Sequence, residues 1–160
     1  MIQTILLLDL DGVLITTPPW KPDLIAQDGY SIFNTACIEN LNTLLACGNF
    51  AIWLNSSRRE GKTLEQFNEI FERRKIKQSI LGFLPPNPNF DNRFVEINRW
   101  LKETKTQDYL IIDDDKSLLD FKYPERLVLT KYMLGFNKEK LEEAKKKAGY
   151  LPPYQNSQLP

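Results

Sequence analysis

Short apolar runs that each have the length of one β-strand are the most restrictive feature of the sequence. The clearest lie at residues 4–8, 50–54 and 109–112, and each ends abruptly in small polar or acidic side chains. Continuous rather than alternating apolar runs are typical of strands buried on both faces of a parallel sheet. Because segments with helical spacing separate these runs, the sequence predicts an α/β fold: a three-layer, doubly wound (Rossmann-like), mostly parallel sheet of five strands.

The remaining elements complete this alternation. Two further strands are expected near residues 80–84 and at 127–129. Helices are expected over about 35–47, from residue 63 to the basic turn at 73–75, over 93–102 and over 138–147. Their expected N-caps are short polar side chains that accept hydrogen bonds from free backbone N–H groups: Asn34 or Thr35, Thr63, Asp91 and Asn137. Asp115 is expected to cap a short helical segment after the fourth strand.

The chain is expected to form one domain with a short tail. Residues 1–150 are assigned to a single domain, because 160 residues suffice for one sizeable core. Within it, residues 16–31 are rich in proline and other turn formers and are expected to form an irregular flap beside the site. Residues 151–160, with three prolines, are expected to be an extended or disordered tail.

Composition narrows the chemistry that the chain can perform. It contains no histidine, which excludes histidine bases, Ser-His-Asp or Cys-His catalysis and histidine-containing zinc sites. Basic and acidic residues balance at 21 each, so no net charge draws the chain to nucleic acid or an anionic membrane. Cys37 and Cys47 lie ten residues apart in an expected helix, which indicates a reduced, cytoplasmic protein. The run at residues 5–8 is too short for a membrane span, and no basic segment precedes it, so no signal peptide is expected.

Polar residues follow three of the expected strands. The carboxyl ends of parallel strands lie at one edge of a sheet, where Rossmann-like folds bind ligands. We therefore expect three polar groups to meet at that edge: Asp9 with Asp11, Asn55 with Ser56, and Asp113 with Asp114.

The predicted group of carboxylates favours a metal site. Carboxylates that lie close together repel one another unless a proton or a cation joins them. Hard cations such as Mg²⁺ take oxygen ligands, so a Mg²⁺ site is expected at the four aspartates. Gly12 allows a sharp turn and close approach of a phosphate to the backbone. Without histidine, the chemistry that remains is metal-assisted attack on an anionic substrate, with Asp9 as the nucleophile that forms an aspartyl-phosphate and Asp11 as general acid and base.

These segments resemble the motifs of a known family. Asp9-Leu10-Asp11-Gly12-Val13-Leu14 resembles motif I of the haloacid dehalogenase-like (HAD) superfamily of phosphatases, and Ile111-Ile112-Asp113-Asp114 resembles its motif IV. The resemblance implies the same roles for Asp9 and Asp11, and Mg²⁺ held by motif IV with Asp114 as the expected direct ligand. Trp53-Leu54-Asn55-Ser56-Ser57-Arg58 is similar to motif II, whose Ser or Thr binds the phosphate; here either Asn55 or Ser56 would do so.

The rest of the chain resembles one subgroup of that superfamily. Residues 92–101, Asn-Arg-Phe-Val-Glu-Ile-Asn-Arg-Trp-Leu, are similar to a segment of the HAD modules of multidomain RNA-repair proteins, and residues 134–139 resemble the loop before the subgroup's last helix. The resemblance covers roughly residues 5–144. It implies that Arg93 supplies the positive charge that binds the phosphate. The gaps between motifs are too short for a cap domain, and a capless site implies a phosphorylated nucleic acid end or another bulky phosphomonoester as substrate.

Two alternatives to a phosphatase remain open from the sequence. One is a HAD-fold phosphate-binding or regulatory protein with little or no turnover, which the unusual Asn55 and the lack of a clear lysine favour. The other is a response-regulator-like receiver, which the Asp-x-Asp-Gly on the first rather than the third strand disfavours. The basic groups at residues 58–59 and 73–75 fit either a nucleic-acid phosphate or ordinary solvated surface. The sequence indicates no oligomeric state and no membrane partner.

Overall fold

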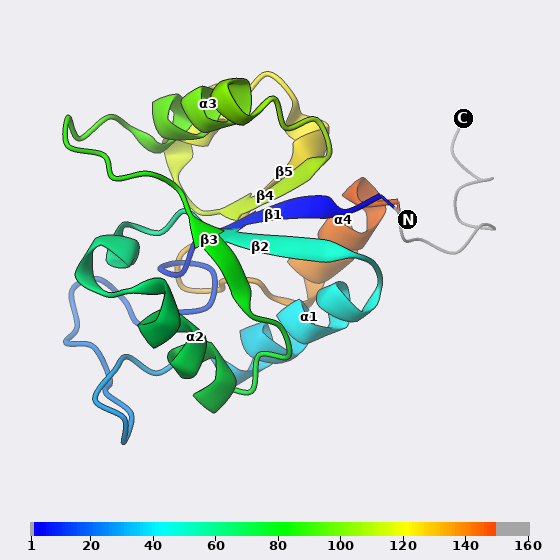
Figure 1. Ribbon diagram of the computed structural model, residues 1–160. Coiled ribbons are helices and arrows are strands. Elements are labelled where there is room, and N and C mark those ends of the chain that lie inside the picture. The colour runs from blue at the N-terminus through cyan, green and yellow to red at the C-terminus, as the bar shows by residue number, and fades with distance from the viewer. Residues whose placement is uncertain (1, 150–160) are drawn as a thin grey trace.

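A single five-stranded sheet organises the computed structural model, which describes residues 2–149. Its strands are β1 (Thr4–Leu8), β2 (Phe50–Leu54), β3 (Ile80–Phe83), β4 (Tyr109–Asp113) and β5 (Leu127–Leu129). All neighbours pair in parallel, in the order β3-β2-β1-β4-β5 (Figure 1). The strand order reverses between β1 and β4, which is where sheets of this kind bind ligands. The predicted fold class is therefore confirmed.

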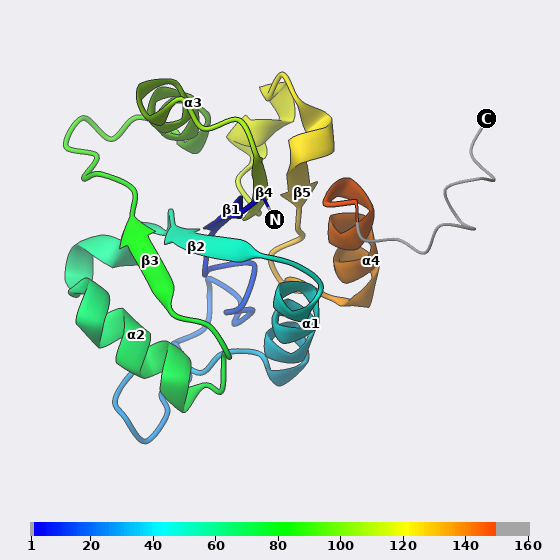
Figure 2. The same ribbon diagram turned by 45° about the vertical axis from the view of Figure 1, so that its right-hand side comes forward.

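Helices cover both faces of the sheet and complete three layers (Figures 1 and 2). One face carries α1 (Thr35–Ala46), α2 (Leu64–Arg73) and α4 (Lys138–Lys147), whereas α3 (Arg93–Thr104) lies on the other face. Short 3-10 turns follow or precede three strands: η1 (Ser57–Gly61), η2 (Lys116–Asp120) and η3 (Pro124–Arg126). The right-handed crossovers expected of parallel strands leave every strand's carboxyl end at one edge.

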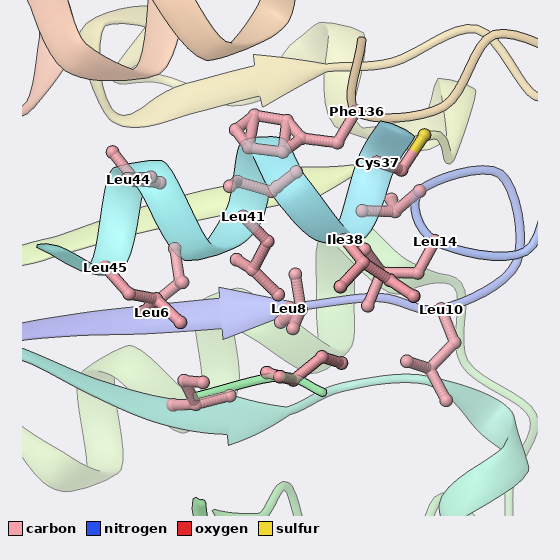
Figure 3. Close-up of a cluster of buried hydrophobic side chains, with 14 of the residues drawn as sticks. Leu6, Leu8, Leu10, Leu14, Cys37, Ile38, Leu41, Leu44, Leu45 and Phe136 are labelled. Carbon is pink, nitrogen blue, oxygen red and sulfur yellow. The ribbon is translucent and has the colours of Figure 1, made fainter. Parts of the chain in front are cut away.

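The central strand is fixed from both sides. Leu6 and Leu8 pack into the larger core beneath α1, as Figure 3 shows, whereas Leu7 packs with Ile111 and Trp100 in the core beneath α3. These three leucines have no exposed surface. Burial of a side chain of this size contributes roughly 1.5–3 kcal/mol to folding. Because β1 is held on both faces, the residue that follows it, Asp9, has a defined position.

The helix caps agree with the sequence except at α3. The side chains of Asn34, Thr63 and Asn137 cap α1, α2 and α4, and Thr63 forms a reciprocal capping box with Gln66. The prediction of Asp91 as the cap of α3 is wrong. The helix begins at Arg93, so the side chain one position before it, Asn92, accepts the hydrogen bond from Val95 N.

The flap, residues 16–31, is irregular, as its prolines predicted. Its two arms meet at an isolated antiparallel bridge between Ile25 and Ser31. Arg74 at the end of α2 ties it down: the guanidinium donates two hydrogen bonds to the Asp28 carboxylate, at 2.7 and 3.0 Å, and further ones to the carbonyls of Tyr30 and Ser31. These bonds lower the pKa of Asp28 to about 2. The flap is therefore anchored to the α2 side of the sheet edge.

Two further expectations concern the cysteines and the tail. Cys37 and Cys47 are both free thiols, and Cys37 is buried beside the carbonyl of Leu134. The predicted tail at residues 151–160 lies outside the described residues. Among residues 2–149, no helix combines the length and apolar character needed to cross a membrane.

Candidate active site

Three adjacent strands deliver the polar residues to one point on the sheet edge. The backbone ladder continues one step past the strands, because Asp9 N donates to Ile112 O at 3.1 Å and Asn55 N donates to Leu8 O at 3.0 Å. Asp113 is the last residue of β4. Because β2, β1 and β4 are direct neighbours, Asp9, Asn55 and Asp113 lie side by side, which is the convergence that the sequence predicted.

Three of the four predicted carboxylates form a compact cluster. One oxygen from each of Asp9, Asp113 and Asp114 lies within 4.8 Å of the other two. Asp9 and Asp113 are buried, and Asp114 is half-buried. Burial raises the pKa of Asp9 to about 7 against the opposing charge of Arg93, and burial together with the charge of Asp113 raises the pKa of Asp114 to about 6. Burial, with the charge of Asp9, also raises the pKa of Asp113 well above its usual range.

This cluster has the properties of a hard-cation site. Its donors are all carboxylate oxygens, which Mg²⁺ prefers, and they are charged groups whose ionisation is costly until a cation binds. Both Asp113 oxygens accept a hydrogen bond, Oδ2 from Asn55 Nδ2 at 3.1 Å and Oδ1 from Asp115 N at 3.0 Å, whereas Asp9 accepts at Oδ1, from Leu10 N at 2.8 Å. Asp9 and Asp114 are therefore the better candidates for direct ligands, with Asp113 holding them in place.

Asp11 lies outside the cluster of three, although we predicted it as a fourth ligand. Its carboxylate instead accepts two hydrogen bonds from Arg58, Nε to Oδ2 at 2.7 Å and Nη2 to Oδ1 at 2.9 Å. The reason is local. The carbonyl of Leu10 accepts from the amides of residues 13–15, so the chain turns immediately after Asp9. Side chains at positions i and i+2 share a side only while the backbone stays extended.

Arg93 provides the positive charge at the site. It is the first residue of α3, and its side chain is only 11% exposed. Nη2 lies 3.9 Å from Asp9 Oδ1, Nε lies 3.6 Å from Asp113 Oδ2, and Nη1 donates to the carbonyl of Asn55. The guanidinium thus stands between the predicted nucleophile and the second strand end, where it could contact a bound phosphate.

Asn55 and Ser56 have different environments, although both are fully buried. Asn55 faces the cluster: its Nδ2 donates to Asp113, and its Oδ1 has no hydrogen-bond partner among residues 2–149. Ser56 caps η1, with its Oγ accepting from Arg58 N at 3.2 Å. Asn55 is therefore the residue of the two whose side chain is bonded to a carboxylate of the cluster, whereas the Ser56 oxygen accepts at the cap and keeps its O–H free to donate.

Gly12 makes room for Asp114. Its φ is +78°, a conformation that favours glycine, and a Cβ at this position would lie 2.3 Å from Asp114 Oδ2. The carbonyl of Gly12 accepts a hydrogen bond of 2.6 Å from Thr130 Oγ1, which follows β5. The glycine therefore allows the loop after β1 to pack directly against the acidic end of β4.

Three other residues lie at the site: the sequence indicated Arg58 and Arg59 as a basic group without their partners, and it did not indicate Tyr132. Arg59 is buried, and its guanidinium donates to the carbonyls of residues 55, 56, 84 and 85 and to the Glu96 carboxylate. Arg58 binds the Asp11 carboxylate. Burial raises the pKa of the Tyr132 hydroxyl, and the nearby charges of Asp11 and Asp114 raise it further. Neither predicted basic group is thus a free patch, because Arg59 and Arg74 are committed internally. A pair of arginines four and five residues after the end of β2 is the one signal that could have indicated this.

Comparison with known proteins identifies the family. Residues 5–141 match the family model described as the HAD domain in Swiss Army Knife RNA repair proteins. No curated protein and no solved structure matches the chain. Asp115 caps η2 as expected, because its side chain accepts a hydrogen bond from Ser117 N. It is therefore separate from the cluster of Asp9, Asp113 and Asp114. Since the family model spans most of the 160 residues, the protein belongs to the HAD domains of Swiss Army Knife RNA repair proteins, within the HAD hydrolase superfamily.

Proposed function

We propose that the protein is a Mg²⁺-dependent phosphatase that hydrolyses a phosphomonoester through an aspartyl-phosphate on Asp9. The observation that carries the proposal is the cluster of Asp9, Asp113 and Asp114 within 4.8 Å, with the Arg93 guanidinium beside it. A carboxylate nucleophile, a group of metal-binding oxygens and one cation are together sufficient for phosphoryl transfer.

The proposed reaction has two steps that use the same two aspartates. In the first, an Asp9 oxygen attacks phosphorus, the bond from phosphorus to the ester oxygen breaks, and Asp11 gives its proton to the departing alcohol. In the second, Asp11 takes a proton from water, the water oxygen attacks phosphorus, and the bond to Asp9 breaks to release inorganic phosphate. Both enzyme groups return to their starting states, so the cycle balances.

The surrounding residues assist this attack in distinct ways. Asp9 and Asp114 would hold Mg²⁺, with Asp113 keeping them in place, and the bound cation would neutralise phosphoryl oxygens and favour the ionised form of Asp9. Arg93 and the side chain of Asn55 would bind phosphoryl oxygens, while the turn at Gly12 lets a phosphate approach the backbone closely. Arg93 also opposes the burial that raises the pKa of Asp9, which keeps the nucleophile closer to ionisation.

The substrate is proposed to be bulky. Between β1 and β2 the chain forms only the flap and α1, and between β2 and α3 only η1, α2, β3 and a loop, so the described residues include no cap domain. An open edge admits large molecules, and the matched family is described by its occurrence in RNA repair proteins. We therefore propose a phosphorylated nucleic acid end, ahead of other bulky phosphomonoesters, as the substrate of a cytoplasmic enzyme.

The test is phosphate release from 4-nitrophenyl phosphate with and without Mg²⁺, followed by a screen of 3′- and 5′-phosphorylated oligonucleotides, phosphopeptides and phosphorylated metabolites. Asp9→Asn keeps the shape of the side chain and removes the nucleophile, so turnover should be lost while the fold is kept. Equal turnover by this variant would exclude Asp9 as the nucleophile.

A phosphate-binding or regulatory protein is the second candidate. Two observations favour it: Asn55 stands where a hydroxyl residue is usual in motif II, and both oxygens of Asp11 are held by Arg58. Beryllium fluoride with Mg²⁺ separates the two candidates. Tight binding that requires Asp9, together with turnover, supports the phosphatase; binding of inorganic phosphate without any turnover on the full substrate set supports the binder.

A further inference from the structure

Arg58 connects the proposed general acid to the flap. On one side it donates two hydrogen bonds to the Asp11 carboxylate, at 2.7 and 2.9 Å. On the other side Nη1 donates to Ser31 Oγ at 3.0 Å, and Nη2 lies 3.1 Å from Asp23 Oδ2. The guanidinium also lies 5.6 Å from the centre of the Tyr30 ring. One side chain therefore contacts both the catalytic edge and three residues of the flap.

The pair with Asp11 restricts what this carboxylate can do. Each Asp11 oxygen accepts one hydrogen bond from Arg58 and keeps a second lone pair, which can carry the proton that passes to a departing oxygen. Opening one of the two bonds would let Asp11 turn within this edge, whereas keeping both holds it still. A bidentate pair fixes the plane of a carboxylate more firmly than a single contact does, so the same bonds also define the direction in which Asp11 points.

The flap offers Arg58 partners that remain when a bond to Asp11 opens. Ser31 is buried, and its hydroxyl donates to Asp23 Oδ2 at 2.6 Å, so Asp23 and Ser31 form a small hydrogen-bonded unit that faces the guanidinium. Asp28 and Arg74 hold the same segment from the other side. The guanidinium can thus give up one Asp11 oxygen without losing its other hydrogen bonds.

We propose that Arg58 is a positioning residue for Asp11, and that it couples the orientation of this proposed acid to the flap through Asp23 and Ser31. The inference rests on the proposed function for its catalytic part. Arg58 is not itself placed against the substrate; it keeps Asp11 directed at the ester oxygen and prevents it from turning into the acidic cluster. The flap sets where the guanidinium sits, and hence where Asp11 sits.

The kinetic test compares two substrates that differ in their need for an acid. The departing group of 2,4-dinitrophenyl phosphate needs little protonation, whereas a phosphorylated primary alcohol depends on it. For Arg58→Ala we expect kcat/KM to fall by on the order of 10²-fold on the alkyl phosphate and by less than about threefold on the dinitrophenyl ester. Asp23→Asn should act in the same direction but more weakly, and Arg58→Lys should recover part of the loss through one retained hydrogen bond.

A matched control comes from an arginine pair away from the catalytic edge. Arg126 pairs with Asp108, just before β4, at 3.5 Å. Arg126→Ala removes an arginine from a more exposed ion pair, 37% against 22% exposed for the two arginines, and should leave the ratio of the two kcat/KM values unchanged. An equal loss on both substrates in Arg58→Ala would overturn the positioning role, because loss of folding or of phosphate binding affects both esters alike.

A second measurement tests the coupling without any turnover. Hydrogen–deuterium exchange of amides bonded within the flap or to it, such as Ala26 N–H to Tyr30 O and the neighbouring Ile32 N–H to Leu24 O, reports how firmly the flap is held. Arg58→Ala should accelerate their exchange about three- to tenfold. Asp11→Asn should accelerate it less, and the double variant should match Arg58→Ala alone, since both changes act on one bridge.

The two measurements separate the two proposals. Unchanged flap exchange in both Arg58→Ala and Asp11→Asn would overturn the coupling, whatever the activity. If turnover persists in Asp9→Asn while the flap responds as expected, the proposed reaction fails and the coupling stands. A selective loss on the alkyl phosphate together with faster flap exchange supports both.

Discussion

Replacing Gly12 by alanine tests how the site holds Asp114. The φ of Gly12 is +78°, so any L side chain there carries a backbone cost of roughly 1–2 kcal/mol. In addition, the new Cβ would lie 2.3 Å from Asp114 Oδ2 and 2.5 Å from its Cγ. Neither distance is tolerable between non-bonded atoms, so Asp114 must move away from the position in which it completes the cluster.

Gly149 supplies a matched control for the backbone part of this cost. It has a φ of +81° at the end of α4, and a Cβ there would have nothing within 4 Å. Gly149→Ala should therefore lose only the roughly 1–2 kcal/mol of backbone strain. Gly12→Ala should lose more, and its affinity for Mg²⁺ should fall about 10- to 100-fold, the range seen when groups that orient metal ligands are removed.

The assays are urea unfolding of both variants without metal and calorimetric titration of each with Mg²⁺. The difference between the two variants isolates the displacement of Asp114, because the strained backbone is common to both. If Gly12→Ala binds Mg²⁺ as tightly as Gly149→Ala does, then Asp114 is not a ligand in the position described here.

Three further predictions address the buried charges. The pKa of Asp9 is about 7 in the folded protein against 3.8 in an unfolded chain, so the metal-free folded state binds more protons than the unfolded state between these pH values. Its unfolding free energy should therefore fall as pH rises from 4 to 7, which denaturant melts at several pH values would show. Mg²⁺ should raise the melting temperature more at pH 7.5 than at pH 5, and an equal rise would contradict this reasoning. Arg93→Ala removes the charge that lowers the pKa of Asp9 and should weaken inhibition by inorganic phosphate about tenfold or more, with Arg99→Ala, on the exposed side of α3, as the control. Arg59→Met leaves the Glu96 carboxylate and four carbonyls without their donor and should cost about 3–5 kcal/mol in urea unfolding, whereas a cost below about 1 kcal/mol would show that water replaces the guanidinium.

Much of the fold followed from local sequence patterns. The bounds of β1, β2 and β5 agree with the expected runs, and all four helices lie where apolar spacing placed them. These features depend on neighbours in the chain: continuous apolar runs suit a sheet buried on both faces, and short polar side chains suit helix starts. The error at α3 was of the same local kind, since Asp91 and Asn92 are both good caps and only the first turn of the helix decides between them.

The candidate site also has one part that the sequence could predict and one part that it could not. That Asp9, Asn55 and Asp113 would meet was predictable, because parallel topology sends every strand's carboxyl end to one edge. That Asp11 would lie outside the acidic cluster was not predictable, because it depends on the turn at the Leu10 carbonyl and on an arginine 47 residues away. Pairings between distant residues are decided by packing and not by spacing along the chain.

The sequence by itself determined which groups the site can use: aspartates at strand ends, a glycine where the chain must turn, and no histidine. Only the tertiary structure decided which charged side chains are buried and which partner each of them contacts. It buries Asp9 and Asp113 so that their pKa values rise, places Arg93 against them, and commits Arg58 to Asp11 and Arg59 to backbone carbonyls. The physical reason is that the energy of a charge depends on its burial and on its nearest partner, and the folded chain alone sets both.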